Sequence, residues 1–285
     1  MPFVRVSTST GNINFHYIIS IPECANAESL DENLPVLLFF HGMGLPTVFH
    51  SQFGDPLLRK FNLVTFHLKF HGETTSDAVP DRYGAEEAAE DALALMEALQ
   101  LPPCHFVTMD IGSMIEMQIA VIHHEKALSL FIMSRLCSEE LPEVYQARKE
   151  LHDLWFSGIP HAPQDVVIGY THICLAVTCQ ILLNCMNFKL FDYSASIHFQ
   201  TWDMNHSAEY SLATYHFFIK CKPYSQETLS RIACPVRLLQ GGNNIVYTES
   251  YTQRFVHDLK QADVDVSWHT VLNALHYLCV EHGPE

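Results

Sequence analysis

The sequence predicts an α/β protein with a mostly parallel, eight-stranded sheet flanked by helices. Three observations lead to this fold class. Long apolar runs such as Leu34–Phe40 have the length and composition of buried parallel strands, which helices cover on both faces. Several runs end in a turn with glycine or asparagine, as at His41-Gly42. An Ala/Glu/Leu segment, 85–99, has strong helical character and stops at Pro102-Pro103.

The other elements follow from the same patterns. Residues 3–20 alternate between apolar and polar side chains, which is typical of an antiparallel hairpin at a sheet edge. The remaining predicted strands lie at 62–68, 106–107, 127–133, 235–240 and 264–271. A long interval without a sheet pattern separates the predicted strands 127–133 and 235–240. It contains three predicted helices, at 143–156, 165–186 and 206–220.

Composition limits the function classes. The chain has 285 residues, 48% of them hydrophobic, and can bury a large core. The formal net charge of −16 argues against nucleic-acid binding, which needs basic surfaces. The apolar segment 166–186 contains His172, Gln180 and Asn184, so we expect a buried helix rather than a membrane span.

The N-terminus and the cysteines predict a cytoplasmic protein. Met1 to Val6 is already strand-like and lacks the pattern of a signal peptide. Nine cysteines, an odd number without framework spacing, indicate reduced thiols. The chain ends at Glu285, shortly after His276. This would leave a surface to which a second copy of the chain could bind, so a homodimer is one of the open interpretations.

The segment 104–120 carries the strongest functional signal. The apolar residues Phe106 and Val107 are followed by a tight turn, 109–112, and then by a helix with a periodic apolar face. A sharp strand-to-helix turn of this kind lifts one side chain above the sheet. In the usual pattern, Gly-x-Ser-x-Gly, the raised residue is serine, whereas here the central residue is Asp110.

On these motifs the chain resembles the α/β-hydrolase superfamily over nearly its whole length. His41-Gly42 resembles the oxyanion segment of that superfamily, 69–74 resembles its Arg-Gly-His-Gly-x-Ser turn, and 274–277 resembles the turn that carries the catalytic histidine. Residues 110–113 resemble the elbow of epoxide hydrolases and haloalkane dehalogenases. The resemblance implies a helical cap at 136–226, inserted after the sixth strand into a core made of 1–135 and 227–285.

The resemblance also implies a mechanism. Asp110 would attack an electrophilic carbon and form an ester, and His276 would activate the water that hydrolyses it. The backbone N–H groups of Met43 and Ile111 would form the oxyanion hole. We therefore expect hydrolysis of a small, fairly apolar molecule, with epoxide hydrolysis ahead of dehalogenation, because Ile111 stands where dehalogenases commonly have tryptophan. No cofactor is expected. Residues expected to line the substrate site are His41 and the cap tyrosines Tyr145, Tyr170, Tyr193, Tyr210 and Tyr215, with Tyr170 and Tyr215 as our choice.

One position departs from the expected triad. Asn244 stands where the family has aspartate, and an amide cannot offset the charge of an imidazolium. Glu139, which follows the preceding predicted strand, is our candidate replacement for this acid. Its alternative interpretation is a solvated glutamate near the start of a cap helix.

Other interpretations stay open. Asp110 and His276 could act as a non-covalent acid/base pair on an ester, a lactone or a carbon–carbon bond. A catalytically inactive protein that binds a small ligand is another alternative. Ser113 is placed in the helix rather than at the turn, which disfavours a serine hydrolase. His67 and His71, like the pair His123-His124, lack a third ligand in sequence, so no metal site is expected.

Overall fold

The computed structural model describes residues 2–136, 139–167, 202–219, 221–244 and 246–281. Its core is one sheet in the order β1-β2-β4-β3-β6-β7-β8-β9, and a two-residue strand, β5, pairs with β2 beside this path. The strands are β1 (Phe3–Thr8), β2 (Gly11–Ser20), β3 (Val36–Phe40), β4 (Asn62–Phe66), β5 (Thr75–Ser76), β6 (Cys104–Asp110), β7 (Ala127–Arg135), β8 (Val236–Gly241) and β9 (Val266–Val271).

The pairing of the strands confirms the predicted fold class. From β4 to β9 all neighbours are parallel, whereas β1 and β2 form an antiparallel hairpin that joins the sheet through an antiparallel β2–β4 pair. Every residue of β3 and β4 is buried. This explains why the central strands have continuous apolar sequences while the edge hairpin alternates.

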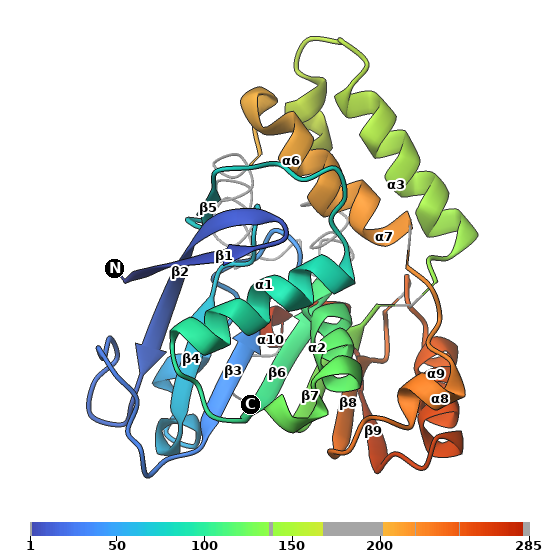
Figure 1. Cartoon of the computed structure of the whole chain (residues 1–285). Coiled ribbons are helices and arrows are strands. Elements are labelled where there is room, and N and C mark those ends of the chain that lie inside the picture. The colour runs from blue at the N-terminus through green and yellow to red at the C-terminus, as the bar shows by residue number, and fades with distance from the viewer. Residues whose placement is uncertain (1, 137–138, 168–201, 220, 245, 282–285) are drawn as a thin grey trace.

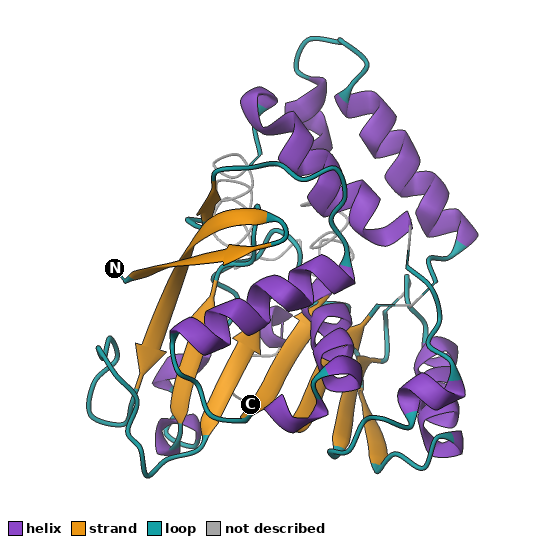
Figure 2. Ribbon diagram, viewed as in Figure 1, coloured by secondary structure: helices purple, strands orange, loops and turns teal. Residues whose placement is uncertain are grey.

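Helices pack on both sides of the sheet. The helices α1 (Ala85–Ala98) and α2 (Ile111–Ile122) lie side by side in front of it (Figure 2). The helices α8 (Gln226–Leu229) and α9 (Glu249–Gln261) lie beside β8 and β9, and α10 (Leu278–Glu281) follows the last strand. The short α10 carries the chain away from His276.

A second group of helices follows β7 and lies above the sheet (Figure 1). It contains α3 (Pro142–Trp155), a 3₁₀ turn at Met204–His206, α6 (Ser207–Ser211), a π-helical turn at Leu212–His216, and α7 (Phe217–Ile219). The indole N–H of Trp202 donates to the Phe70 carbonyl at 3.0 Å, which ties this group to the turn after β4. The predicted helix 165–186 lies mostly outside the described residues, and the domain boundaries at 136 and 226 stay predictions.

Within the part of the chain that the structure describes, no helix is both long and apolar enough to cross a membrane. The described cysteines, Cys24, Cys104, Cys221, Cys234 and Cys279, are all free thiols. Cys104 and Cys234 are buried, whereas Cys24 is exposed.

One carboxyl group in the core makes stability depend on pH. Glu116 of α2 is fully buried, and burial raises its pKa well above the usual value. The folded protein therefore holds a proton that the unfolded chain releases above about pH 4.5. The stability consequently falls as pH rises from there toward the folded-state pKa.

We predict that Glu116→Gln removes this loss. Each pH unit inside that window costs the wild type about 1.4 kcal/mol through this one group, and the amide has no proton to lose. Unfolding by urea at pH 5 and pH 8 should therefore show a smaller drop for Glu116→Gln than for the wild type. An equal drop in both proteins would contradict the prediction.

Candidate active site

Asp110 lies at a sharp turn between β6 and α2. Its backbone angles, φ 54° and ψ −120°, are unusual for a residue other than glycine and mark local strain of the kind found at functional sites. The turn is tight because α2 starts against β3. A Cβ on Gly112 would lie 2.6 Å from the Phe40 carbonyl oxygen, so only glycine fits at that position.

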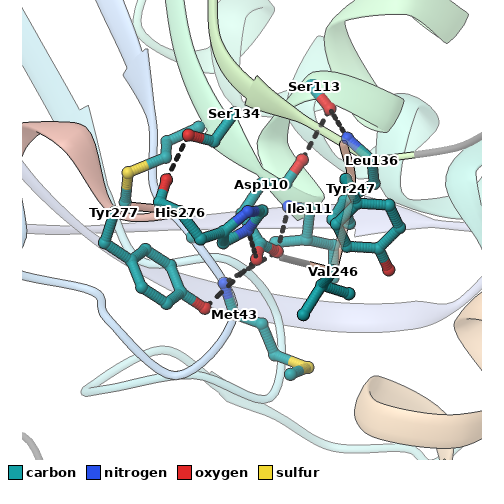
Figure 3. A network of polar contacts seen from close by, with 12 residues as sticks. Met43, Asp110, Ile111, Ser113, Ser134, Leu136, Val246, Tyr247, His276 and Tyr277 are labelled. Atoms are coloured by element: carbon teal, nitrogen blue, oxygen red, sulfur yellow. Dashed lines mark hydrogen bonds and ion pairs between the residues drawn. The ribbon is translucent and has the colours of Figure 1, made fainter. Parts of the chain in front are cut away.

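Each oxygen of the Asp110 carboxylate has its own partners (Figure 3). Oδ1 accepts hydrogen bonds from the backbone N–H of Ile111 and, at 3.5 Å, of Met43. Oδ2 lies 2.9 Å from His276 Nε2 and accepts a hydrogen bond from the Tyr277 hydroxyl at 3.1 Å. The turn thus aims one oxygen at two main-chain donors and the other at two side chains.

Asn244 determines which nitrogen of His276 carries the proton. The Asn244 Oδ1 atom accepts hydrogen bonds from the N–H groups of Val246 at 3.2 Å and Tyr247 at 3.1 Å. The amide nitrogen must then face His276 Nδ1, 2.9 Å away, and it can only donate. Nδ1 therefore acts as acceptor, and the ring proton lies on Nε2, where it is donated to Asp110.

The backbone of the histidine loop is held in place as well. The Ser134 hydroxyl donates to the carbonyl oxygen of His276, and Ser134 itself has a positive φ of 50° at the end of β7. Ser134 thus links the loop after β9 to the strand next to Asp110.

The electrostatics of the site favour an ionised Asp110. Burial raises the pKa of the Asp110 carboxyl, but the hydrogen bond that His276 Nε2–H donates, together with the charge of this ring when it is protonated, opposes this effect. With smaller contributions from Arg148 and from the Ile111 N–H, they hold the pKa below its usual value. Asp110 is therefore a carboxylate at neutral pH, which is the form that a nucleophile or a base requires.

The structure brings together five of the residues singled out in the sequence: Asp110, His276, Asn244, Met43 and Ile111. The other predicted site residues lie elsewhere. Glu139 is exposed, and the partner of His276 Nδ1 is Asn244. Tyr215 packs against His152 and Tyr145 in the helical group and makes none of the contacts described for Asp110. Tyr170 lies outside the described residues.

His41 has no ring nitrogen left for a substrate. Its side chain is completely buried. Nδ1 lies 2.7 Å from the Gly42 carbonyl oxygen, and Nε2 accepts the N–H of Leu68 at 2.9 Å. His41 therefore holds the loop after β3 to the turn after β4. Ser113 is likewise occupied, because its hydroxyl donates to the Asp110 carbonyl at 2.6 Å.

A buried ion pair that the sequence did not point to lies next to this site. Arg148 Nε of α3 and Glu140 Oε2 are 2.8 Å apart, with side chains only 9% and 6% exposed. The Tyr247 hydroxyl donates to Glu140 Oε1 at 2.9 Å, and Arg148 donates to the Thr214 carbonyl at 3.3 Å. The pair thus joins the helical group to the loop that follows Asn244. Glu140 directly follows Glu139, but no sequence pattern distinguishes the two.

We predict that Arg148→Met lowers the free energy of unfolding by about 3–5 kcal/mol, because it leaves the Glu140 carboxylate buried without its cation. The double variant Arg148→Met/Glu140→Gln should recover part of this loss, since the unpaired charge is then gone. Urea unfolding of the three proteins measures both effects. A loss below about 1 kcal/mol in the single variant would show that the pair contributes no more than a surface ion pair.

A cavity of about 550 Å³ lies beside the site rather than at it. Its walls come from the start of α1, from α2, and from the segment between α7 and α8; Ser113 and Leu136 line it, but Asp110 and His276 do not. We therefore do not assign it to the substrate of Asp110.

The sheet order, the strained turn after β6 and the histidine loop after β9 now allow a comparison with known proteins. The family described as alpha/beta hydrolase fold matches residues 35–169, which include β3, the turn at Asp110 and β7. The chain has the α/β-hydrolase fold. No curated protein sequence matches the chain.

Solved structures with this fold align along nearly the whole chain. A thermophilic esterase from Thermogutta terrifontis is 16% identical, with a TM-score of 0.72, and the alignment covers 99% of this chain and 93% of that one. The N-acyl homoserine lactone degrading enzyme Est816 is 15% identical, with a TM-score of 0.70, over 98% and 95%. An enol-lactonase from Burkholderia xenovorans LB400 is 15% identical, with a TM-score of 0.68, over 98% and 94%. At these identities the likeness concerns the fold.

Proposed function

We propose that the protein is a hydrolase that forms a covalent ester on Asp110, and that its reaction is the opening of an epoxide on a small, fairly apolar molecule. The observation that carries this proposal is the position of Asp110 Oδ1 against the N–H groups of Ile111 and Met43. An oxyanion hole stabilises the oxygen that becomes negative in a tetrahedral intermediate. If an ester on Asp110 is hydrolysed, that oxygen is Oδ1 itself.

The same observation weighs against direct attack on a substrate carbonyl. In that reaction the carbonyl oxygen of the substrate must enter the oxyanion hole, which Asp110 Oδ1 already occupies. The esterases and lactonases among the structural neighbours therefore support a hydrolase, but the carboxylate at the turn favours attack on a saturated, electrophilic carbon. The ring carbon of an epoxide is such a centre.

The first step needs a nucleophile and an acid. Asp110 Oδ2 bonds to the ring carbon while the carbon–oxygen bond of the epoxide breaks, and the released oxygen takes a proton. The Tyr277 hydroxyl, 3.1 Å from Oδ2, lies beside this position and is our candidate for the proton donor. The tyrosinate that it leaves regains a proton in the second step, from the water that hydrolyses the ester.

The second step needs a base, and here Asn244 has its effect. Water attacks the Asp110 carboxyl carbon only if His276 Nε2 has a free electron pair to take the proton. The Asn244 amide stabilises the opposite tautomer, with the proton on Nε2. We therefore expect hydrolysis of the ester to be slow and the ester to accumulate in the wild type.

The orientation of Asn244 also favours a second candidate, a protein that binds a small ligand without turnover. His276 would then only donate a hydrogen bond to the buried carboxylate. The two candidates differ in one observable, which is whether a covalent adduct forms on Asp110.

The test is intact-protein mass spectrometry after incubation with a panel of epoxides, haloalkanes and activated esters. We expect an adduct on wild-type protein that is longer-lived in His276→Gln, and peptide mapping should place it on Asp110. Asp110→Asn is the matched control and should give no adduct. No adduct together with turnover would indicate a non-covalent acid/base pair, and neither adduct nor turnover would indicate the binding protein.

A further inference from the structure

The cavity of about 550 Å³ beside Asp110 lies between the sheet-covering helices and the helical group. The start of α1 and one side of α2 form its walls on the core side, and Phe217 of α7 with residues 221–225 forms the opposite wall (Figure 1). Small-molecule sites typically have volumes of about 300–1,000 Å³. Lys222 and Ser225 are exposed, so the cavity opens to solvent at this wall.

Part of the cavity wall is apolar. Four side chains that are at most 8% exposed contribute to it: Met114 and Met117 of α2, Leu136 after β7, and Phe217 of α7. Met114 and Met117 are three residues apart and therefore share one face of α2. Methionine side chains adapt to the shape of their neighbours, which suits a ligand with a flexible apolar body.

The charged side chains around the cavity have a different balance from the rest of the chain. The protein has 16 Lys and Arg residues against 32 Asp and Glu residues. The cavity, however, is lined by three cations, Arg82, Arg135 and Lys222, and by two carboxylates, those of Glu86 and Glu87. Arg82 pairs with both carboxylates, at 3.7 Å from Glu86 and 2.6 Å from Glu87. The lining thus keeps a net positive charge, which favours an anionic ligand.

Gln118 of α2 adds a neutral hydrogen-bond donor to this lining. Its Oε1 atom accepts a hydrogen bond from the Tyr224 hydroxyl at 2.9 Å. Burial raises the pKa of Tyr224, so the hydroxyl keeps its proton at neutral pH and acts as the donor. The amide nitrogen of Gln118 can only donate, and it has no acceptor among the described residues. Its N–H groups are therefore available to a ligand in the cavity.

We propose that this cavity binds a small amphipathic anion, a molecule with a flexible apolar body and one carboxylate. The apolar body packs against Met114, Met117 and Phe217, and the carboxylate accepts hydrogen bonds from Gln118 Nε2 and Lys222 Nζ. Such charge-assisted hydrogen bonds are stronger than those between neutral groups. The site is separate from the reaction at Asp110, because neither Asp110 nor His276 lines the cavity.

A ligand in this position contacts two parts of the fold at once. Met114 and Met117 belong to α2 on the sheet, whereas Phe217 belongs to the helical group that follows β7. A molecule that binds only the folded protein stabilises it in proportion to the logarithm of its concentration. The ligand should therefore stabilise the packing of the helical group on the core and raise the unfolding temperature.

The test is calorimetric titration of the whole protein with octanoate and with 1-octanol, which has the same chain length but no charge. We expect one octanoate to bind per chain. Binding of 1-octanol should be weaker by about tenfold or more, because hydrogen bonds to a carboxylate are stronger than those to a hydroxyl. The unfolding temperature, measured in parallel, should rise with octanoate.

Two variants connect the binding to this cavity. Gln118→Glu keeps an oxygen for the Tyr224 hydroxyl but replaces the amide donor by a charge that repels the carboxylate, and it should weaken octanoate binding about tenfold or more. Lys222→Glu should have an effect of the same size. Lys260→Glu is the matched control, because it makes the same change of charge at an exposed position of α9 outside the cavity. This control should bind octanoate as the wild type does.

Three results would overturn the proposal. The first is that the wild type binds no octanoate, and the second is that 1-octanol binds as tightly as octanoate. The third is that either Gln118→Glu or Lys222→Glu binds octanoate as tightly as the wild type, which would place the carboxylate elsewhere. Lys222 is exposed and Gln118 is only half-buried, so both variants should fold.

Discussion

Asp110→Asn should lower the rate of adduct formation and turnover by about 10⁵ to 10⁶, the size of the loss seen when a catalytic nucleophile is removed. The amide keeps the shape of the side chain but has no charged oxygen to attack a carbon. Asparagine also tolerates positive φ better than most residues, so the strained turn should persist. The substitution thus removes the chemistry and leaves the fold.

The comparison of Asp110→Asn with the wild type needs a control variant that changes a neighbour of Asp110 but keeps its carboxylate. Tyr277→Phe removes only the hydroxyl that donates to Asp110 Oδ2 and keeps the carboxylate. It should slow epoxide opening by about 10² to 10⁴, the range for one acid catalyst, while activated haloalkanes, which need no proton, should react nearly as before. If Asp110→Asn retained more than about one hundredth of the wild-type rate, Asp110 would not be the nucleophile.

Asn244→Asp should speed hydrolysis of the Asp110 ester by up to about 10⁴. This is the factor by which an enzyme with a Ser-His-Asp triad loses activity when its aspartate is replaced by asparagine and the histidine takes the wrong tautomer. A carboxylate at 244 accepts a hydrogen bond from Nδ1–H, which frees the electron pair on Nε2. It also stabilises the imidazolium that forms when water is deprotonated.

Rapid-mixing measurements can separate the two steps. The wild type should show a burst of adduct formation followed by slow turnover, and Asn244→Asp should keep the burst rate while the slow phase becomes faster. Asn243→Asp is the matched control, because it adds the same charge one residue away at an exposed position. Equal rates in wild type and Asn244→Asp would mean that the tautomer of His276 does not limit hydrolysis.

The fold was predictable because its signals are local. A strand covered on both faces needs a largely apolar sequence, and β3, β4 and β7 all have one. The same holds for the turn at Asp110, since a short strand, a glycine and an apolar helix follow one another in the sequence. That Asn244 and His276 meet Asp110 at one edge of the sheet was implied by the resemblance of their turns to those of α/β-hydrolases.

The places of Glu139 and of the tyrosines could not be predicted in this way. Glu139 and Glu140 are neighbours in sequence, yet one is exposed and the other is buried against Arg148, because the path of the chain after β7 decides which side chain turns inward. Tyr277 donates to Asp110, whereas Tyr215 packs in the helical group. The residue type alone does not indicate which tyrosine contacts the carboxylate and which packs among the helices.

The sequence by itself determined the class of fold, the carboxylate at the turn and the histidine that follows the last strand. These depend on residue type and on spacing of a few positions. Only the tertiary structure decided the orientation of the Asn244 amide, the ion pair of Arg148 and the meeting of His16 with His67. Hydrogen bonds, ion pairs and ring contacts depend on distances of a few ångströms between residues far apart in the chain, and these distances exist only once the chain has folded.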